Sequence, residues 1–364
     1  MSGPKAHDWI ADMAPYVPGK SSVSGVKNPV KLSSNECAYG PSPKAVQAFA
    51  DAAETMLRYP EGGSDKLRHA IADVYKLDAD RLICGTGSGD ILTLLIHAYT
   101  GPGDEIIYSE YGFSLYPVQT EAVGATGVAV PNKNWAADVD GILAAVSEDT
   151  KLVFVDNPNN PTGAYLCERE IERLHAGLPQ DVLLVLDGAY AECVTAKDYC
   201  AGERLVERAE NVVMTRTFSK MYALAGLRVG WAYGPRRIVD MLNRIRMPFN
   251  VSVSAQPAAA AAVQDEDHLR ASVAFNDEWR AAMTAGLTAL GLDVVTSQAN
   301  FILVGFPAEG DKTANLANQF LNEHGYIVRA LSVLPDHLRI SVGTAEQNNA
   351  VIAILTEFMN GSPQ

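Results

Sequence analysis

The stretch LVFVDNPNNPTG, residues 152–163, joins a short apolar run to a turn rich in asparagine, proline and glycine. This order is typical of a buried β-strand that ends at the edge of a sheet. Similar β-rich apolar runs with polar boundaries occur at 105–108, 182–187, 212–217 and 229–233. Helical patterns separate the middle runs, at 168–178 and 204–210, which is the βαβ rhythm of a largely parallel sheet. The sequence therefore predicts an α/β fold.

The rest of the chain predicts an arm before these strands and a second domain after them. The arm is irregular and rich in Pro, Gly, Ser and Lys, and it precedes expected helices at 43–56 and 63–75. A broken helix is expected over 235–290. Beyond it we expect strands at 293–296, 301–304, 326–329 and 338–342 and helices at 311–324 and 344–359. The expected division is an arm at 1–42 that contributes to the small domain or to a dimer contact, a large domain at 43–250 and a small α+β domain at 251–364.

Composition narrows the class of protein. With 364 residues, 48% of them hydrophobic, the chain is too apolar to be disordered, and its net charge of −14 argues against nucleic acid as a partner. No apolar run approaches the roughly 20 residues of a membrane-spanning helix. The N-terminus lacks a continuous apolar signal segment, so we expect a cytoplasmic protein with no membrane partner. The five cysteines form no Cys-x-x-Cys pair and the seven histidines no i, i+4 pair, so no metal site is predicted.

Polar residues follow three of the predicted strands at their carboxyl ends. Asn160 lies in the turn after the strand at 152–156. Asp187 and Tyr190 follow the next strand, and Lys220 follows the strand at 212–217. Taken singly, each residue type is more typical of a structural role: Asn160 of a turn, Asp187 of a helix N-cap and Lys220 of an exposed surface. Because ligands of open parallel sheets bind at this edge, the four together predict one functional rim.

Three segments carry more specific motifs: NPNNPTG at 157–163, DGAY at 187–190 and TFSKMYALAGLRVG at 217–230. Together they resemble the fold-type I pyridoxal-phosphate aminotransferases of class I and II. Further agreement at 32–43, 58–60, 85–90 and 338–343 extends the resemblance over nearly the whole chain. The resemblance implies a large domain with a mostly parallel seven-stranded sheet flanked by helices, plus a small α+β C-terminal domain.

The resemblance assigns roles to the rim residues. Lys220 would form a Schiff base with pyridoxal 5'-phosphate and move the proton at the substrate's Cα. Asp187 would face the pyridine nitrogen and favour the protonated ring. The resemblance thus implies three catalytic residues, Lys220, Asp187 and Tyr190. Asn160 and Tyr190 would hydrogen-bond the phenolic oxygen of the ring. Phe113 would stack on the ring face, with packing in the core as an open alternative.

The phosphate of the cofactor needs several hydrogen-bond donors. The loop at 85–90 lies between a short strand, 81–84, and an apolar helix, so Gly87, Ser88 and Gly89 would offer backbone N–H groups at a helix N-terminus. The expected side-chain donors are Thr217, Ser219 and Arg228. By the same resemblance Tyr59 reaches the phosphate in the neighbouring subunit, which implies a homodimer.

Substrate recognition is expected to depend on two arginines. Arg339 matches the family arginine that holds the anionic group of the substrate, and Arg329 matches a second one in the histidinol-phosphate branch. Two arginines suit a dianionic phosphate. Tyr16 resembles a substrate-contacting tyrosine of the N-terminal arm, and Asn160 is expected near the substrate as well. The chain departs from the family pattern at Gly188, where an acidic residue is usual, and from the histidinol-phosphate branch at 330–334.

The resemblance implies an aminotransferase of histidine biosynthesis. It would move an amino group between histidinol phosphate and a 2-oxo acid, 2-oxoglutarate. The nearest alternative is an aromatic amino-acid aminotransferase. A nicotinamide-dependent dehydrogenase would explain the glycine-rich loop at 85–90 but not Lys220 with Asp187. A third hypothesis is a non-catalytic regulator that binds the cofactor.

Overall fold

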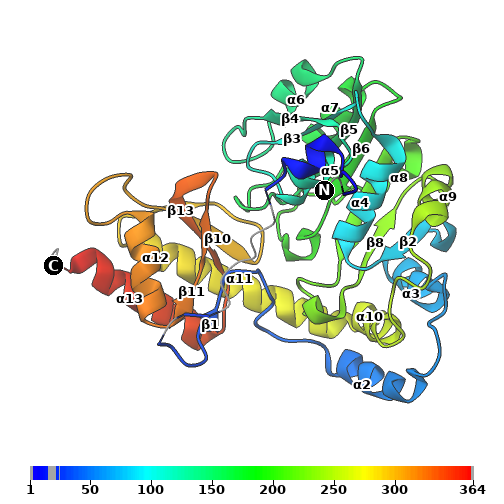
Figure 1. Ribbon diagram of the computed structural model, residues 1–364. Coiled ribbons are helices and arrows are strands. Elements are labelled where there is room, and N and C mark those ends of the chain that lie inside the picture. Colours follow the sequence, from blue (N-terminus) through cyan, green and yellow to red (C-terminus); the bar gives the residue numbers. More distant parts are fainter. Residues whose placement is uncertain (1–2, 15–21, 24, 362–364) are drawn as a thin grey trace.

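The computed structural model describes residues 3–14, 22–23 and 25–361, and its centre is a seven-stranded sheet (Figure 1). The strand order is β2 (Leu82–Gly85), β8 (Gly230–Tyr233), β7 (Val212–Thr217), β6 (Leu183–Asp187), β5 (Thr150–Asp156), β3 (Glu105–Ser109) and β4 (Thr126–Val130). The five strands from β7 to β4 run parallel, whereas β8 is antiparallel to both of its neighbours. The predicted mostly parallel sheet is confirmed.

The sequence analysis predicts no strand at β4. This strand pairs only with β3 at the edge of the sheet, and most of its residues are exposed or half-buried. Gly127 interrupts it, and it lacks the continuous apolar run that marks a strand covered on both faces. The other six strands are covered on both faces, which is why their sequences are recognisable.

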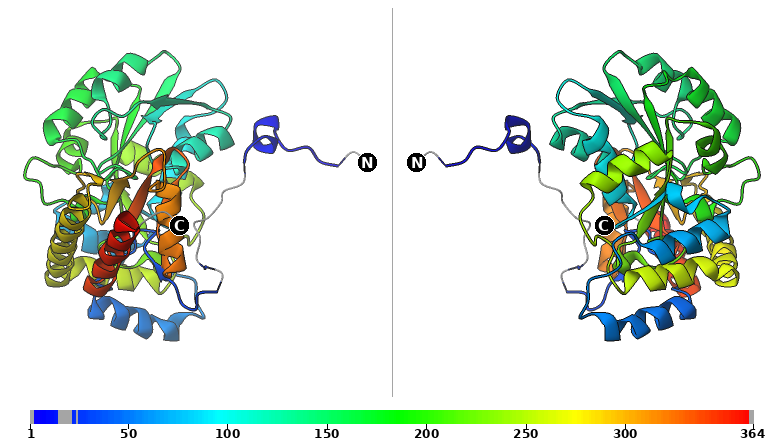
Figure 2. Two further views of the ribbon diagram at one scale, coloured as in Figure 1. Left: turned by 90° about the vertical axis from the view of Figure 1, so that its left-hand side faces the viewer. Right: turned by 90° about the vertical axis from the view of Figure 1, so that its right-hand side faces the viewer.

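Helices cover both faces of the sheet, as the turned views in Figure 2 show. One face packs against α4 (Ser88–Tyr99), α5 (Leu115–Ala122) and α9 (Arg236–Ile245). The other packs against α3 (Asp65–Tyr75), α6 (Val139–Ala145), α7 (Glu168–Gly177), α8 (Glu203–Arg208) and α10 (Ala255–Gln264). Along β5, Val153 and Val155 contact the second layer and Phe154 the first, because successive strand residues point to opposite faces.

A second, four-stranded sheet has the order β12 (Arg329–Leu331), β13 (Leu334–Ser341), β10 (Phe301–Gly305) and β9 (Asp293–Val295), all antiparallel. It packs with α11 (Glu266–Thr288), α12 (Ala314–Glu323) and α13 (Ala345–Asn360) around an apolar cluster of its own. The predicted strand at 326–329 is wrong in one respect. It is two strands, because β11 (Tyr326–Ile327) pairs in parallel with β1 (Val30–Lys31), while β12 joins β13.

The expected break-containing helix at 235–290 comprises α9, α10 and α11. The helix expected at 43–56 is shorter than predicted, because α2 (Pro43–Asp51) tightens into a 3₁₀ turn. The 3₁₀ turns are η1 (Ala52–Thr55), η2 (Ala79–Arg81), η3 (Ala191–Cys193) and η4 (Ala225–Leu227).

Although α10 lies beyond the proposed boundary at 250, it packs on α2 and α3. The domain division therefore stays a proposal, and this packing favours a second boundary at Asp265, between α10 and α11.

The described residues 3–14 lie at one side of the molecule (Figure 2). Their short helix α1 (Asp8–Ala11) touches α5, where the indole Nε1 of Trp9 donates to the carbonyl of Ala122 at 3.3 Å. Within the described part of the chain, no helix combines the length and the apolar character needed to cross a bilayer. The cytoplasmic location stays a prediction from the sequence.

Candidate active site

The carboxyl ends of β5, β6 and β7 meet at one edge of the large sheet. Their register sets Asp187 beside Thr215 of β7. The carboxylate of Asp187 accepts hydrogen bonds from the hydroxyls of Tyr116, at 3.0 Å, and Thr215, at 3.1 Å, and from the backbone N–H of Ala189 at 3.2 Å. Burial raises the pKa of Asp187, and these donors, together with the charge of Lys220, oppose that rise. The site therefore contains a buried carboxylate at its floor that three protein donors hold.

Lys220 lies three residues after β7 and faces the same space. Its Nζ donates to the carbonyl of Ser34 at 3.3 Å and lies 5.4 Å from the ring centroid of Tyr190. Burial, followed by the charge of Arg339, lowers the pKa of Lys220 from 10.5 to about 8. An amine with this pKa can exchange a proton near neutral pH.

Tyr190 is held by Asn35, a residue for which the sequence predicts no individual role. Its hydroxyl accepts a hydrogen bond from the side-chain amide of Asn35 at 2.9 Å, and its ring packs edge-on against Phe301. Ser341 donates in turn to the side-chain oxygen of Asn35 at 3.0 Å. Asn35 has φ 58°, a left-handed conformation that asparagine tolerates better than most residues. An asparagine in a Ser-Ser-Asn turn is the only sequence signal for this residue.

Three donors predicted for the phosphate, Ser88, Ser219 and Arg228, lie around Gly87, and we call these four residues the phosphate cradle. The backbone N–H of Gly87, also predicted for the phosphate, donates instead to the carbonyl of Gly85 at 2.8 Å. Gly87 has φ 88°, and a Cβ on it would come within 2.6 Å of Nη2 of Arg228. Nη1 of Arg228 donates to the hydroxyl of Ser219 at 3.1 Å. Ser88 begins α4, so its backbone N–H belongs to the unpaired first turn of that helix.

The other residues predicted for the phosphate lie beside this cradle. Thr217 exchanges hydrogen bonds with Ser219, since the two hydroxyls lie 3.1 Å apart and the backbone N–H of Ser219 donates to Thr217 at 3.1 Å. Gly89 lies in the first turn of α4. The carboxylate of Asp90 accepts the backbone N–H of Thr86 at 2.9 Å. This contact stabilises the glycine-rich loop itself.

The two predicted arginines lie opposite each other on neighbouring strands, because β12 pairs Arg329 with Arg339 of β13. Cross-strand partners project to the same face of a sheet. Nη1 of Arg339 donates to the side-chain oxygen of Asn160 at 2.5 Å, and Nη2 donates to the carbonyl of Ser33 at 2.7 Å. Asn160 therefore joins the large sheet to the arginine strand. Tyr16 lies outside the described residues.

The two remaining predicted residues are Phe113 and Tyr59, and their roles stay predictions. Phe113 is half-buried and contacts Tyr116 edge-on, with 5.8 Å between centroids, so it packs on the residue that binds Asp187. Tyr59 is 81% exposed, and its ring stacks on Phe249 with 4.7 Å between centroids. The described chain thus presents Tyr59 to the outside rather than to its own rim.

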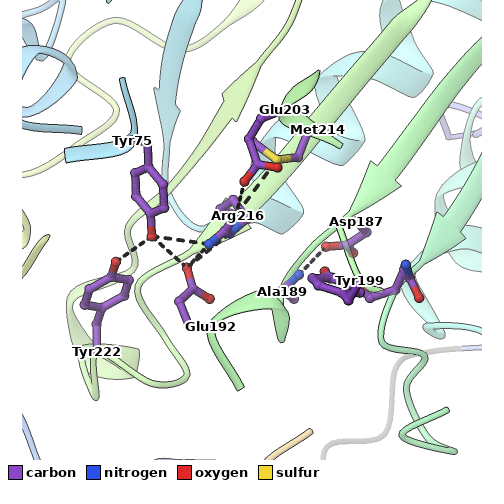
Figure 3. A network of polar contacts seen from close by, with 10 residues as sticks. Tyr75, Asp187, Ala189, Glu192, Tyr199, Glu203, Met214, Arg216 and Tyr222 are labelled. Carbon is purple, nitrogen blue, oxygen red and sulfur yellow. Dashed lines mark hydrogen bonds and ion pairs between the residues drawn. The ribbon is translucent and has the colours of Figure 1, made fainter. Parts of the chain in front are cut away.

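A buried charge cluster lies behind the rim, on the α3 side of the sheet (Figure 3). Arg216 of β7 donates to Glu192 at 2.9 Å and to Glu203 at 3.1 Å, and its side chain is only 5% exposed. Nη2 of Arg216 also donates to the hydroxyl of Tyr75 at 3.2 Å, which lies 2.7 Å from the hydroxyl of Tyr222. Burial raises the pKa of Tyr75 to about 12, so its hydroxyl keeps its proton.

This cluster connects the two turns that carry the rim residues. Glu192 lies two residues after Tyr190, and Tyr222 lies two residues after Lys220. Because Arg216 binds Glu192 directly and Tyr222 through Tyr75, the turns after β6 and β7 share one buried anchor. The cluster is not predictable from the sequence, because its five residues come from separate parts of the chain.

Known proteins resemble this chain over its full length. The sequence model for aminotransferase class I and II matches residues 27–355. A histidinol-phosphate aminotransferase of Rhodopseudomonas palustris (strain HaA2) is 51% identical over 362 residues, 99% of each chain. A second, of Paramagnetospirillum magneticum (strain ATCC 700264 / AMB-1), is 49% identical over 361 residues, again 99% of each.

A solved structure agrees with these sequences. The crystal structure of histidinol-phosphate aminotransferase from Sinorhizobium meliloti in complex with pyridoxal-5'-phosphate superposes with a TM-score of 0.90. The identity is 26%, and the match covers 98% of each chain. The expected fold, a large sheet flanked by helices with a small α+β part, is confirmed. This chain belongs to the class I and II aminotransferase family.

Proposed function

We propose that this protein is a pyridoxal-phosphate-dependent aminotransferase that moves an amino group between histidinol phosphate and a 2-oxo acid, 2-oxoglutarate, in histidine biosynthesis. The observation that carries the proposal is the convergence of Lys220, Asp187 and the phosphate cradle at one edge of the sheet. The names of relatives that are 51% and 49% identical over 99% of the chain support the choice of substrate. They do not favour the aromatic alternative, and the family does not favour a dehydrogenase.

The residues at this edge fit pyridoxal phosphate. A phosphate needs N–H and O–H donors, and the cradle combines a helix N-terminus, the Ser219 hydroxyl and the Arg228 guanidinium. Gly87 keeps the space beside Arg228 free of a side chain, since a Cβ there would lie 2.6 Å from the guanidinium. When bound, the cofactor supplies an aldehyde for a lysine amine and a ring that withdraws electrons from the substrate's Cα.

The side chains around this space have separate tasks. Lys220, with a pKa of about 8, can accept a proton from the substrate's Cα and return it. Asp187 provides a negative charge that favours a protonated ring nitrogen. Tyr190, held by Asn35, and Asn160, held by Arg339, present polar groups at fixed positions. These roles follow the family pattern and are part of the proposal.

Substrate choice is proposed to depend on the arginine pair. Arg329 and Arg339 face each other across β12 and β13, which suits a dianion better than a single arginine would. Histidinol phosphate carries its phosphate where an amino acid carries its α-carboxylate.

A substrate panel tests the proposal. We expect kcat/KM for histidinol phosphate to exceed those for phenylalanine and tyrosine by about 10-fold or more, since one extra charge-assisted hydrogen bond is worth about 1.5–3 kcal/mol. Initial rates with 2-oxoglutarate as acceptor give the three values. A larger kcat/KM for either aromatic amino acid would show that the substrate is misassigned, and no transamination at all would reject the proposed activity.

The phosphate cradle can be tested at Gly87. Gly87→Ala should weaken binding of pyridoxal phosphate by about 10-fold or more, because the new Cβ displaces the Arg228 guanidinium and one charge-assisted hydrogen bond is lost. Gly103→Ala is the matched control, because Gly103 has φ 96° and open space around it, so only backbone strain is added. Fluorescence titration should show unchanged affinity for pyridoxal, which has no phosphate. An equal loss for pyridoxal would place the phosphate elsewhere.

We also propose a homodimer in which Tyr59 reaches the site of the neighbouring subunit. Large apolar side chains remain exposed close in sequence to the stacked rings of Tyr59 and Phe249, among them Met56, Leu57, Ile245 and Met247. Exposed apolar groups that gather in this way mark protein interfaces. Sedimentation equilibrium should give about twice 39.0 kDa, and a mass of one chain would refute the dimer.

A further inference from the structure

A second buried carboxylate lies beside Asp187. Asp156 is the last residue of β5, and the parallel register pairs it with Asp187 of β6. The two residues are 6% and 3% exposed. By strand alternation both side chains point to the face that α5 covers, where Phe154 of β5 and Val185 of β6 also pack. The roles proposed above do not use Asp156.

Asp156 binds the turn that carries Asn160. One carboxylate oxygen accepts the backbone N–H of Asn160 at 2.8 Å, and the other accepts the side-chain amide of Asn159 at 3.0 Å. The side-chain oxygen of Asn159 accepts in turn from the hydroxyl of Thr162 at 2.8 Å. Asn160 then accepts from Arg339 through its own side-chain oxygen, at 2.5 Å. A continuous path of hydrogen bonds therefore runs from Asp156 to the substrate arginine.

We propose that Asp156 is a positioning residue of this site, whose ionised carboxylate holds Asn160 in place and, through Asn160, orients Arg339 for the anionic group of the substrate. This inference rests on the proposed function and adds to it a residue that does not contact the substrate. The position of a guanidinium determines whether it binds two oxygens of an anion at once. Loosening Asn160 should therefore weaken substrate binding more than it slows the chemical step.

The charge state of Asp156 decides how well it holds the turn. Only the ionised form offers both oxygens as acceptors without carrying a proton. The titratable groups that face it are Asp187 from β6 and Tyr116 from α5. The nearest cations act on its neighbours: Lys220 on Asp187, and Arg339 on Tyr190. Burial and the charge of Asp187 raise the pKa of Asp156 to about 7, against the opposing effect of the Asn160 N–H.

Ionisation of Asp156 has opposite effects on the site and on the fold: it strengthens the hold on Asn160 and lowers the stability of the folded protein. As pH falls through about 7, Asp156 takes up a proton and its hold on Asn160 weakens. Because its pKa in the folded protein lies above the unfolded value of 3.8, ionisation lowers the stability of the fold as pH rises through about 7. A carboxylate whose only role is to stabilise the fold would not lower its stability on ionisation.

Asp156→Asn tests the proposal in the holoenzyme. An amide accepts through its one oxygen only. Its NH₂ group replaces a carboxylate oxygen that accepted a hydrogen bond, so it faces an N–H donor, that of Asn160 or of the Asn159 side chain. At pH 8 we expect KM for histidinol phosphate to rise about 10-fold, with kcat changed less than about 3-fold, as one lost charge-assisted hydrogen bond implies. The ratio of variant to wild-type KM should fall toward 1 as pH drops to 6, because wild-type Asp156 is then protonated. The ionisation of the substrate phosphate cancels in this ratio.

Asp138→Asn is the matched control. The Asp138 carboxylate also accepts a backbone N–H, that of Asp140 at 3.2 Å, but it caps α6. The ratio of the Asp138→Asn KM to the wild-type KM should stay near 1 at every pH. A pH-independent ratio for Asp156→Asn, or a kcat that falls as much as KM rises, would overturn the positioning role.

Melting of the full chain without added cofactor provides a readout that does not depend on turnover. At pH 8 Asp156→Asn should melt no lower than wild type, and its melting temperature should fall less than that of wild type between pH 6 and pH 8. A variant that melts well below wild type at pH 8, or fails to fold, would show a purely structural carboxylate and reject the inference. Wild-type turnover in the same assay separately tests the proposed function.

Discussion

Replacing Lys220 with alanine should reduce kcat by about 10⁴-fold or more and leave the fold intact, because a proton-transfer group alone contributes about 10²- to 10⁴-fold and this amine is also the proposed nucleophile. The side chain is half-buried and makes one hydrogen bond, to the carbonyl of Ser34, so little packing is lost. Single-turnover and steady-state rates with histidinol phosphate measure the effect. Lys66→Ala, at an exposed position of α3, should leave kcat unchanged.

Two further observations would separate a catalytic Lys220 from a structural one. Burial lowers the pKa of Lys220 to about 8, so its charged form costs stability below that pH, and Lys220→Ala without added cofactor should melt no lower than wild type at pH 7. Borohydride reduction of the loaded wild-type protein should leave pyridoxal phosphate attached to Lys220. Attachment to any other lysine, or wild-type rates in the alanine variant, would remove Lys220 from the reaction.

The next largest effect is expected at Asp187. Asp187→Asn keeps the shape and can still accept from the Tyr116 hydroxyl, but it removes the negative charge from the floor of the site. An adjacent opposite charge shifts a pKa by about 1 to 3 units, so kcat should fall by about 10- to 10³-fold. Rates measured from pH 6 to 9 should show the deficit growing as pH rises, since the ring nitrogen then depends more on a neighbouring anion to stay protonated.

Tyr116→Phe is the graded control for that result. It removes one donor to Asp187 but leaves the carboxylate and its other donors, Thr215 and Ala189, in place. We expect a smaller loss of kcat than in Asp187→Asn, because only one hydrogen bond to the carboxylate, worth about 1.5–3 kcal/mol, is removed and the negative charge remains. Because burial raises the pKa of Asp187, the asparagine variant should lose no stability at pH 8. A kcat for Asp187→Asn within a factor of three of wild type would mean that its charge has no catalytic role.

Much of the fold could be predicted because it is local in the sequence. Strands covered on both faces, such as β5 and β6, appear as short apolar runs, and the helices between them follow a 3.6-residue period. The edge strand β4 lacks that signature, and β11 and β12 were not separable, because pairing partners distinguish them. The rim residues Asn160, Asp187 and Lys220 were predictable because each directly follows a recognisable strand.

The sequence by itself determined the family, the strand ends and the types of group that they carry. Only the tertiary structure decided how those groups are held. Asn35 contacts Tyr190 across 155 residues, Arg339 contacts Asn160 across 179, and the Arg216 cluster reaches Tyr75 across 141. Such contacts leave no periodic trace along the chain, since they arise from packing and from strand register. For the same reason the sequence indicates only that Asp156 ends a strand, and it is the strand register that pairs it with Asp187.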